Sequence, residues 1–203
     1  MDNHFRLARP EDSDSILAIY APYVRDTVTS FELEPPTSAE YRARVETIGS
    51  VYPFLVHETK GGIDGFAYAS RQFERRGYDY NVFTSVYLAP DAQGRGVGKA
   101  LYERLFAILG EQGYCNAYAI ITLPNERSVG LHRGFGFEDL GIHRRTGYKF
   151  GRWCDVIWMG KDLGALDDPP CCVPVTAIPE DVMETILTRG SAAEPKPAQI
   201  KKD

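Results

Sequence analysis

A glycine-rich turn is the stretch of this sequence whose residue types point most directly to chemistry. Gln93-Gly94-Arg95-Gly96-Val97-Gly98-Lys99 follows an apolar run at 82–88 and opens an amphipathic run at 97–112. Such a turn can aim successive backbone N–H groups at phosphate oxygens, with the positive end of the following helix behind them. The turn therefore predicts a polyphosphate-bearing ligand, although a glycine pair before a helix could also form no more than a tight turn.

The residues beside the glycines separate the kinds of phosphate loop. A nucleoside-triphosphate loop needs Gly-Lys followed by Ser or Thr, so that the hydroxyl reaches Mg²⁺, whereas Gly98-Lys99 is followed by Ala100. A dinucleotide turn needs glycines spaced G-x-G-x-x-G, and only the pair Gly96 and Gly98 fits. Both differences disfavour a magnesium nucleotide and a dinucleotide, and they leave Gln-x-x-Gly-x-Gly as the pattern to explain.

Length, composition and charge set the class of protein. The chain has 203 residues, 43% of them hydrophobic, which suits one domain with a full core. A net charge of −5 without a lysine or arginine cluster disfavours nucleic acid as a partner. We find no leader-like segment and no long apolar run, so we expect a cytoplasmic protein with no membrane partner. The four cysteines lack metal-ligand spacing, so we expect reduced thiols and no metal site.

Hydrophobic periodicity predicts an alternating order of elements around the glycine-rich turn. Strands are expected at 5–8, 54–58, 63–69, 82–88, 117–121, 140–148 and 153–159, with helices at 97–112 and 125–133. A first helix carries an apolar stripe at 16–20 and ends or kinks at Pro22. Thr37 and Glu40 form a capping box for the second. This order predicts a mixed α/β sheet with helices on both faces.

The composition changes near residue 166, where the chain becomes rich in proline. We therefore divide the chain into one domain at 1–165 and a C-terminal extension at 166–203. Within the extension we expect a short helix at 181–187 and a disordered end at 191–203.

The glycine-rich turn and the order of elements resemble the GNAT superfamily of acyl-CoA N-acyltransferases. Further blocks resemble its phosphinothricin and methionine sulfoximine (sulfone) acetyltransferase branch, over about residues 5–163. These blocks are Tyr78-Asp79-Tyr80, Ser85-Val86-Tyr87-Leu88, Leu123-Pro124-Asn125, Leu131-His132 with Gly136-Phe137, and Gly147 to Trp153 with Asp155-Val156.

The resemblance implies the GNAT fold, a mixed and mostly antiparallel sheet of about seven strands that splays between the fourth and fifth. It also implies an enzyme with acetyl-CoA as co-substrate and no metal. Direct acetyl transfer would go to the α-amino group of a small amino acid or analogue like phosphinothricin, methionine sulfoximine or methionine sulfone. The enzyme would be a cytoplasmic homodimer.

By the same resemblance, backbone groups do most of the cofactor binding. Val86, Tyr87 and Leu88 would hold the pantetheine arm, and the N–H groups of Arg95 to Lys99 would hold the pyrophosphate. Gln93 and Gly94 would bind the cofactor as part of the same turn. The acyl-CoA chain would also contact Asn125, Ser128 and His132. Asn125 is equally suited to capping the following helix, and one residue can do both.

The resemblance gives His132 a catalytic role. The branch has His there, where many GNAT enzymes place a Tyr as general acid, and a neutral imidazole can donate to an oxyanion or a leaving sulfur. The alternative is a structural histidine. The branch usually carries a Glu as general base two residues before Ser-Val-Tyr, and this chain has Phe83. Either another group accepts the proton, with Asp79 and its neighbours Tyr78 and Tyr80 as candidates, or water carries it to bulk solvent. Asp79 could equally be a solvated turn residue.

An amino-acid acceptor would need a guanidinium for its carboxylate. Arg75 holds the branch's arginine position, and the adjacent Arg76 could substitute. Phe31 and Glu34 would lie over the acceptor pocket, or be a core and a surface residue.

Three more residues complete the expected acceptor site. Tyr148 and Lys149 would shape the pocket and, across a two-fold axis, the dimer. Phe83 would line the pocket and make it more apolar, which favours a larger or more hydrophobic acceptor side chain. Two other functions stay open: a non-catalytic acyl-CoA-binding protein, and an N-acetyltransferase of another amine or a peptide N-terminus.

Overall fold

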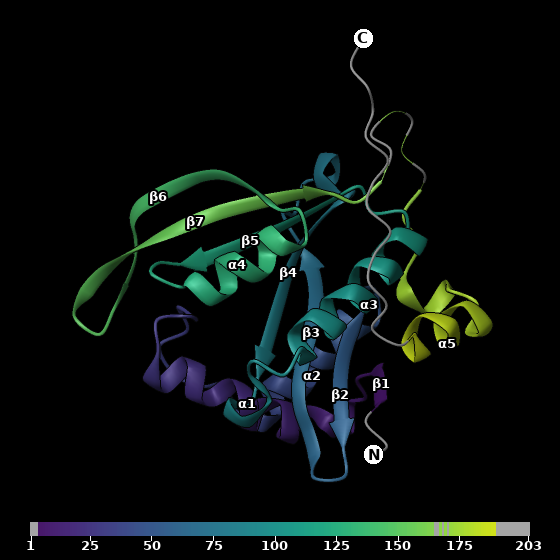
Figure 1. Ribbon diagram of the computed structural model, residues 1–203, viewed down its shortest axis with the longest axis horizontal. Helices are drawn as coiled ribbons and strands as arrows, with labels where there is room; N and C mark the ends of the chain where they lie inside the picture. Colours follow the sequence, from purple (N-terminus) through teal and green to yellow (C-terminus); the bar gives the residue numbers. More distant parts are fainter. Residues whose placement is uncertain (1–3, 165–166, 168, 170, 190–203) are drawn as a thin grey trace.

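A single seven-stranded sheet organises the part of the chain that the computed structural model describes, residues 4–164, 167, 169 and 171–189 (Figure 1). The strand order is β1-β2-β3-β4-β5-β7-β6. Only β4 and β5 run parallel, so the predicted mixed and mostly antiparallel sheet is confirmed. The strands are β1 (His4–Leu7), β2 (Phe54–Thr59), β3 (Gly62–Arg71), β4 (Asn81–Leu88), β5 (Asn116–Thr122), β6 (Glu138–Lys149) and β7 (Arg152–Asp162).

The two parallel strands separate after a short paired stretch. Residues 81–83 of β4 pair with residues 116–118 of β5, and the pairing stops there. From Thr84 to Leu88, β4 pairs only with β3. The predicted splay is thus confirmed, and Figure 1 shows β5 diverging from β4 toward α4.

Helices cover both faces of the sheet, as the sequence predicts. On one face α1 (Ser13–Asp26) and α2 (Ser38–Gly49) pack over β2 and β3, and on the other α3 (Val97–Glu111) crosses the sheet centre beside α4 (Glu126–Gly134). Strand alternation supplies both cores. The fully buried members include Ile16, Val24, Val56 and Phe66 on the α1 face, and Leu55, Ala67, Val82, Leu101, Leu105 and Leu109 on the α3 face.

Two local predictions about the first helices have opposite outcomes. The capping box of α2 is confirmed, because Thr37 N donates to Glu40 Oε2 at 2.8 Å and Glu40 N donates to Thr37 Oγ1 at 3.3 Å. An end of α1 at Pro22 is wrong, since the helix continues to Asp26. A proline removes one backbone donor, but Val24 beyond it is fully buried, and this packing keeps the last turn in place.

The C-terminal extension contributes to the core. The predicted short helix is confirmed as α5 (Glu180–Thr188), which packs on α3 and β1 and buries Ile186. Arg104 of α3 caps its end by donating from Nε to the Leu187 carbonyl at 3.0 Å and from Nη2 to the Arg189 carbonyl. The predicted disordered end at 191–203 lies outside the described residues. No helix in the described part is long and apolar enough to cross a membrane.

Candidate functional site

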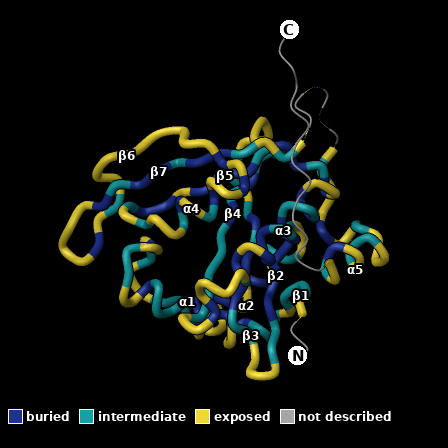
Figure 2. The backbone as a smooth tube through the Cα atoms, in the orientation of Figure 1, coloured by how far each residue is buried: buried dark blue, intermediate teal, exposed yellow. Residues whose placement is uncertain are grey.

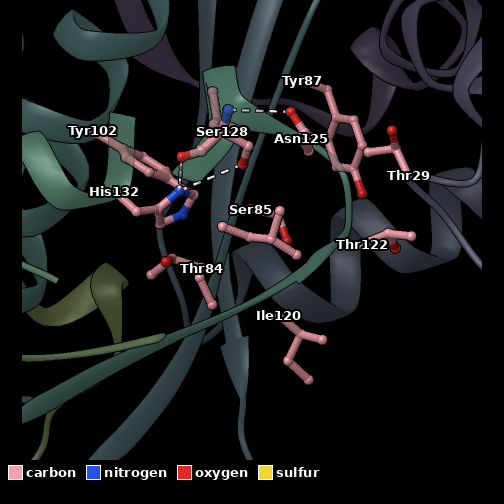
Figure 3. A pocket seen from close by; sticks show the side chains of 13 residues that line it. Thr29, Thr84, Ser85, Tyr87, Tyr102, Ile120, Thr122, Asn125, Ser128 and His132 are labelled. Atoms are coloured by element: carbon pink, nitrogen blue, oxygen red, sulfur yellow. Dashed lines mark hydrogen bonds between the residues drawn. The ribbon is translucent and has the colours of Figure 1, made fainter. Parts of the chain in front are cut away.

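A narrow pocket of about 60 Å³ opens where β4 and β5 separate (Figure 3). The two strands form its walls, the helices α3 and α4 close one side, and the loop after α1 reaches the other. The lining residues are Thr29, Thr84, Ser85, Val86, Tyr87, Tyr102, Ala119, Ile120, Ile121, Thr122, Asn125, Ser128 and His132. Of the predicted site residues, the structure therefore brings Val86, Tyr87, Asn125, Ser128 and His132 together here.

His132 is buried in this pocket with both ring nitrogens engaged. Its Nδ1 lies 2.7 Å from the Ser128 carbonyl oxygen, which can only accept, so Nδ1 is assigned the proton. Its Nε2 then accepts from the Tyr102 hydroxyl at 3.1 Å. A neutral His132 consequently exchanges protons with the pocket at Nε2, next to Tyr102.

Burial sets the charge of this network. Desolvation lowers the pKa of His132 below its ordinary 6.5, against the opposing effect of the Ser128 carbonyl, so the imidazole is neutral at pH 7. Desolvation also raises the pKa of Tyr102, although a hydrogen bond with Thr84 works against it. The hydroxyl of Tyr102 therefore keeps its proton. The sequence analysis did not identify Tyr102 as a site residue. The feature that could have indicated it is a tyrosine next to the buried apolar stripe of α3.

The glycine-rich turn has the backbone shape that an anion cradle needs. Gly94 and Gly96 have φ of 73° and 83°, in the left-handed region, and Gly96 is the N-cap of α3. A Cβ on Gly98 would lie 3.3 Å from Leu88 Cδ1, so glycine allows the helix to approach β4 closely. The first backbone N–H groups of α3 have no partner within the helix and are directed at this loop. These features fit a pyrophosphate.

Gln93 fastens the turn to its neighbours. Its Nε2 donates to the Tyr23 hydroxyl at 3.2 Å, and its Oε1 accepts from Arg127 of α4 at 3.2 Å. The Tyr23 hydroxyl in turn donates to the Leu88 carbonyl at 2.6 Å. Gln93 thus links α1, α4 and the end of β4, a positioning role for a residue that was expected to contact the cofactor.

Asn125 was predicted to cap the following helix, to contact the acyl-CoA chain, or to do both. Its side-chain oxygen accepts from Ser128 N at 3.2 Å and so caps α4, while the same residue lines the pocket. The cap is confirmed. Its contact with an acyl-CoA chain stays a prediction.

The residues predicted to bind the acceptor are spread around the pocket. Lys149 is buried, with Nζ donating to the Val24 carbonyl at 2.6 Å and the Ser30 carbonyl at 2.7 Å, and burial lowers its pKa. Its ammonium therefore binds the end of α1 and the loop after it. Phe31 of that loop lies on the backbone of Gly147 in β6, where an added Cβ would collide with its ring. Tyr148 is exposed and contacts Trp153 edge-on.

The loop between β3 and β4 holds the other predicted residues. Asp79 is exposed and accepts from Arg71 Nη2 at 2.7 Å, and Tyr78 contacts the ring of Phe73. Arg75 is exposed on the same loop, and Glu34 is exposed in the loop after α1. Within the described part of the chain, none of these residues lines the pocket, and no carboxylate does. Their roles in catalysis and binding stay predictions.

Phe83 faces away from His132. The side chain of Thr84 points toward Tyr102 of α3, so its neighbours Phe83 and Ser85 point to the opposite face of the sheet. There the Phe83 ring meets Phe73 at 6.1 Å and Trp158 at 5.7 Å between centroids. Among the described residues, no group of three His, Cys, Asp or Glu side chains could hold a metal ion.

Comparisons with known proteins agree with this geometry. Residues 5–158 match the family described as Acetyltransferase (GNAT) domain. The chain is similar to phosphinothricin N-acetyltransferase of Alcaligenes faecalis, 37% identical over 80% of this chain and 83% of that protein. It is also similar to L-methionine sulfoximine/L-methionine sulfone acetyltransferase of Pseudomonas aeruginosa, 35% identical over 84% of this chain and 100% of that protein.

A solved structure shows the same fold. The crystal structure of a GNAT superfamily phosphinothricin acetyltransferase from Sinorhizobium meliloti, in complex with AcCoA, has a TM-score of 0.80 and 37% identity. The match covers 85% of this chain and 96% of that one.

Proposed function

Because the chain belongs to the GNAT acetyltransferase family, we propose that it acetylates the α-amino group of a small amino acid or analogue, such as phosphinothricin, methionine sulfoximine or methionine sulfone. It is an acetyl-CoA-dependent N-acetyltransferase with the GNAT fold. One observation carries the proposal: the pocket at the β4–β5 splay places the neutral His132 network near a glycine turn shaped for pyrophosphate.

The residues around the splay would hold acetyl-CoA mainly through the backbone. The N–H groups from Arg95 to Lys99 would bind the pyrophosphate, with the positive end of α3 behind them. The pairing of β4 with β5 ends at Phe83, so the backbone of Val86, Tyr87 and Leu88 has no partner in β5. This stretch of backbone would bind the pantetheine arm. Asn125 and Ser128 would contact the same arm from α4, where both line the pocket.

The Tyr102–His132 pair would handle the proton of the leaving thiolate. The Tyr102 hydroxyl lies in the pocket wall and donates its single proton to His132 Nε2. For the transfer, this proton would turn from Nε2 to the departing thiolate, so that the O–H bond breaks, the S–H bond of CoA forms, and the tyrosinate regains a proton from water. The base is a separate matter. Since no carboxylate lines the pocket in the described residues, we propose that the ammonium loses its proton through water to bulk solvent, because neither Asp79 nor Tyr78 is among the lining residues.

Arg75 is the proposed reader of the acceptor's carboxylate, because an exposed guanidinium can bind both oxygens at once. Phe31, fixed on Gly147, would cover the acceptor from the α1 side. The names of the relatives support an amino-acid-like acceptor, which would bring a carboxylate to this site.

The experiment is a screen for CoA thiol release from acetyl-CoA with amino acids, their sulfone, sulfoximine and phosphinate analogues, and the matching methyl esters. The wild type should prefer the free acids. Arg75→Ala should raise the KM of the acid about ten- to a hundredfold, which corresponds to one charge-assisted pair, and leave the KM for acetyl-CoA unchanged. Equal rates with ester and acid would point to an amine or peptide acceptor. No thiol release with any amine would leave a binding protein.

We also propose a cytoplasmic homodimer. The β6–β7 hairpin projects from the body of the molecule (Figures 1 and 2). Near its tip the side chains of Tyr148, Phe150 and Trp153 are exposed. A cluster of exposed aromatic side chains on a projecting hairpin is typical of a protein interface. The cytoplasmic location follows from the need for acetyl-CoA.

A further inference from the structure

A row of aromatic rings crosses the sheet beside the pocket, on the face opposite α3. Tyr78 and Phe73 of the β3–β4 loop are 4.9 Å apart between centroids, Phe73 and Phe83 6.1 Å, and Phe83 and Trp158 of β7 5.7 Å. All three pairs meet edge-to-face, and His143 of β6 stacks on Trp158 at 5.4 Å. We call Phe73, Tyr78, Phe83 and Trp158 the aromatic row.

The aromatic row lies on an open part of the sheet. Helices α1 and α2 pack mainly on the β2–β3 half of this face. In the β3–β4 loop, Phe73 is 42% exposed and Tyr78 40%. Ile120, a central-strand residue opposite Trp158, is 45% exposed. Buried strands rarely leave such large apolar side chains in water, and a contiguous exposed apolar surface indicates a binding site.

The row is continuous with the pocket. Ile120 and Ser85 line the pocket, and Trp158 and Phe83 are their neighbours on the same face. Residues two apart on one face of a strand are about 7 Å apart. An amino acid whose nitrogen sits near Ser85 would therefore extend its side chain over Phe83, where the related enzymes are expected to carry a glutamate.

The charges nearby decide which side chain fits. Aromatic rings can attract a cation as well as an apolar group. The loop that carries Phe73 and Tyr78 also carries Arg75 and Arg76, and Arg71 stands at the end of β3 just before it. The acids here are Glu74 and Asp79, and Asp79 is already paired with Arg71. The basic residues outnumber the acids, which disfavours a cationic side chain and favours a carboxylate.

We infer that the aromatic row is a subsite for the aromatic side chain of the acceptor, so that the preferred substrate is an aromatic L-amino acid. The inference rests on the proposed function, keeps its α-amino acid acceptor, and replaces the small side chain by an aromatic one. A further ring would join the existing edge-to-face series, a geometry that adds to the gain from burial alone. The small polar side chains of phosphinothricin or methionine sulfone would gain little from it.

The test compares acceptors with acetyl-CoA saturating, by CoA thiol release: phenylalanine, tryptophan, methionine sulfone and lysine. We expect kcat/KM for phenylalanine or tryptophan to exceed that for methionine sulfone at least about tenfold. Phe83→Glu should reduce that preference at least tenfold and raise the rate with methionine sulfone, mostly below neutral pH. If Phe83→Glu fails to fold, Phe73→Ala on the exposed loop makes the same test of the aromatic preference. Val51→Ala is the control, because it removes a side chain that is 39% exposed and lies outside the aromatic row.

Several outcomes would overturn the subsite. The first is a higher kcat/KM for methionine sulfone or lysine than for the aromatic amino acids. The second is an equal loss of kcat/KM with every acceptor in Phe83→Glu and Phe73→Ala. The third is a change in the molecular mass of these variants by light scattering while the acceptor preference is unchanged, which would make the aromatic row a contact between copies of the chain. Failure to acetylate any amino acid, while acetyl-CoA binds by calorimetry, would instead refute the proposed function and the subsite with it.

Discussion

The Nδ1 proton of His132 is donated to a backbone carbonyl, so only Nε2 is left to take part in proton transfer. The Ser128 carbonyl holds the Nδ1 proton, so the imidazole can act only through Nε2, where Tyr102 is bound. A histidine arranged in this way works as an acceptor that orients a hydroxyl. Proton donation into the pocket would then fall to Tyr102, whose hydroxyl must first turn its single proton away from Nε2.

Tyr102→Phe tests this division of roles. We expect kcat to fall about ten- to a hundredfold, because the variant lacks the hydroxyl that contacts His132 Nε2. The KM for acetyl-CoA should stay within about twofold, because the glycine turn is unchanged. His132→Ala should cost about ten- to a thousandfold in kcat. Tyr114→Phe, another buried tyrosine outside the pocket, is the control in steady-state assays. Normal turnover in Tyr102→Phe would make the pair structural.

The lowered pKa of His132 also predicts how stability depends on pH. Between 6.5 and the lower folded value, the unfolded chain binds a proton that the folded chain does not. The contribution of His132 to the unfolding free energy is therefore complete above pH 6.5 and decreases as the pH falls below it. Denaturant unfolding at pH 7.5 and 5.5 should show a larger drop for the wild type than for His132→Gln. Equal drops would mean that the folded pKa is not lowered.

At the residue scale, the sequence could predict the members of the site that belong to a local pattern. Asn125 precedes a helix and was predicted as its cap, and His132 stands in a recognisable frame. Tyr102 could not be predicted as its partner, because the contact joins residues 30 apart on two helices whose approach depends on the whole sheet. The same holds for Lys149, whose carbonyl partners lie 119 and 125 residues away.

Among the elements, the glycine turn is the one whose backbone decides binding. Gly96 has φ of 83° and open space around it, so a side chain there is opposed by conformation rather than by a clash. Gly96→Val should weaken acetyl-CoA binding by at least about tenfold in calorimetry, because a β-branched residue would pull the turn out of its left-handed geometry. Gly62→Val, at φ of 106° in the β2–β3 hairpin, imposes a similar strain elsewhere and should leave affinity unchanged. Unchanged affinity in Gly96→Val would refute the pyrophosphate assignment.

Lys149 ties the β6–β7 hairpin to the end of α1. Lys149→Met keeps the stem but leaves the carbonyls of Val24 and Ser30 without their donor, which should cost about 2–3 kcal/mol of unfolding free energy. The loop carrying Phe31 would loosen, so the KM of the acceptor should rise while that of acetyl-CoA stays constant. Lys60→Met, on an exposed turn, is the matched control. Equal stability and KM in both variants would show that the tie is dispensable.

The periodic elements were predictable because each has a buried stripe of its own. The strands and helices from β2 to β7 appear within a few residues of their predicted bounds. Pro22 misled the prediction, since tertiary packing of Val24 outweighed a local helix-breaking preference. The packing of α5 depends on Arg104 meeting a chain segment more than 80 residues away, which no local pattern contains.

At the scale of the whole molecule, the tip of the β6–β7 hairpin carries an exposed aromatic residue in a backbone conformation that aromatic residues disfavour. Phe150 and Gly151 both have positive φ, at 50° and 72°, as in the two-residue turns where Asn-Gly is favoured. A phenylalanine in this conformation is strained and yet 57% exposed, beside Trp153 at 59%. Inside the chain the ring meets only the Lys149 ammonium, 5.1 Å from its centroid, among the contacts of the described residues. In the proposed dimer, a second chain would cover the exposed part of this strained residue.

Phe150→Asn separates folding from assembly. Asparagine suits the left-handed conformation, so the unfolding free energy of the single chain should stay the same or rise by on the order of 1 kcal/mol. If the tip is the dimer contact, light scattering should find twice the 22.7 kDa chain mass for the wild type and the single-chain mass for the variant. Leu33→Asn, at a side chain 72% exposed outside the hairpin, should remain a dimer. A wild type of single-chain mass, or a variant that stays dimeric, would place the contact elsewhere or remove it.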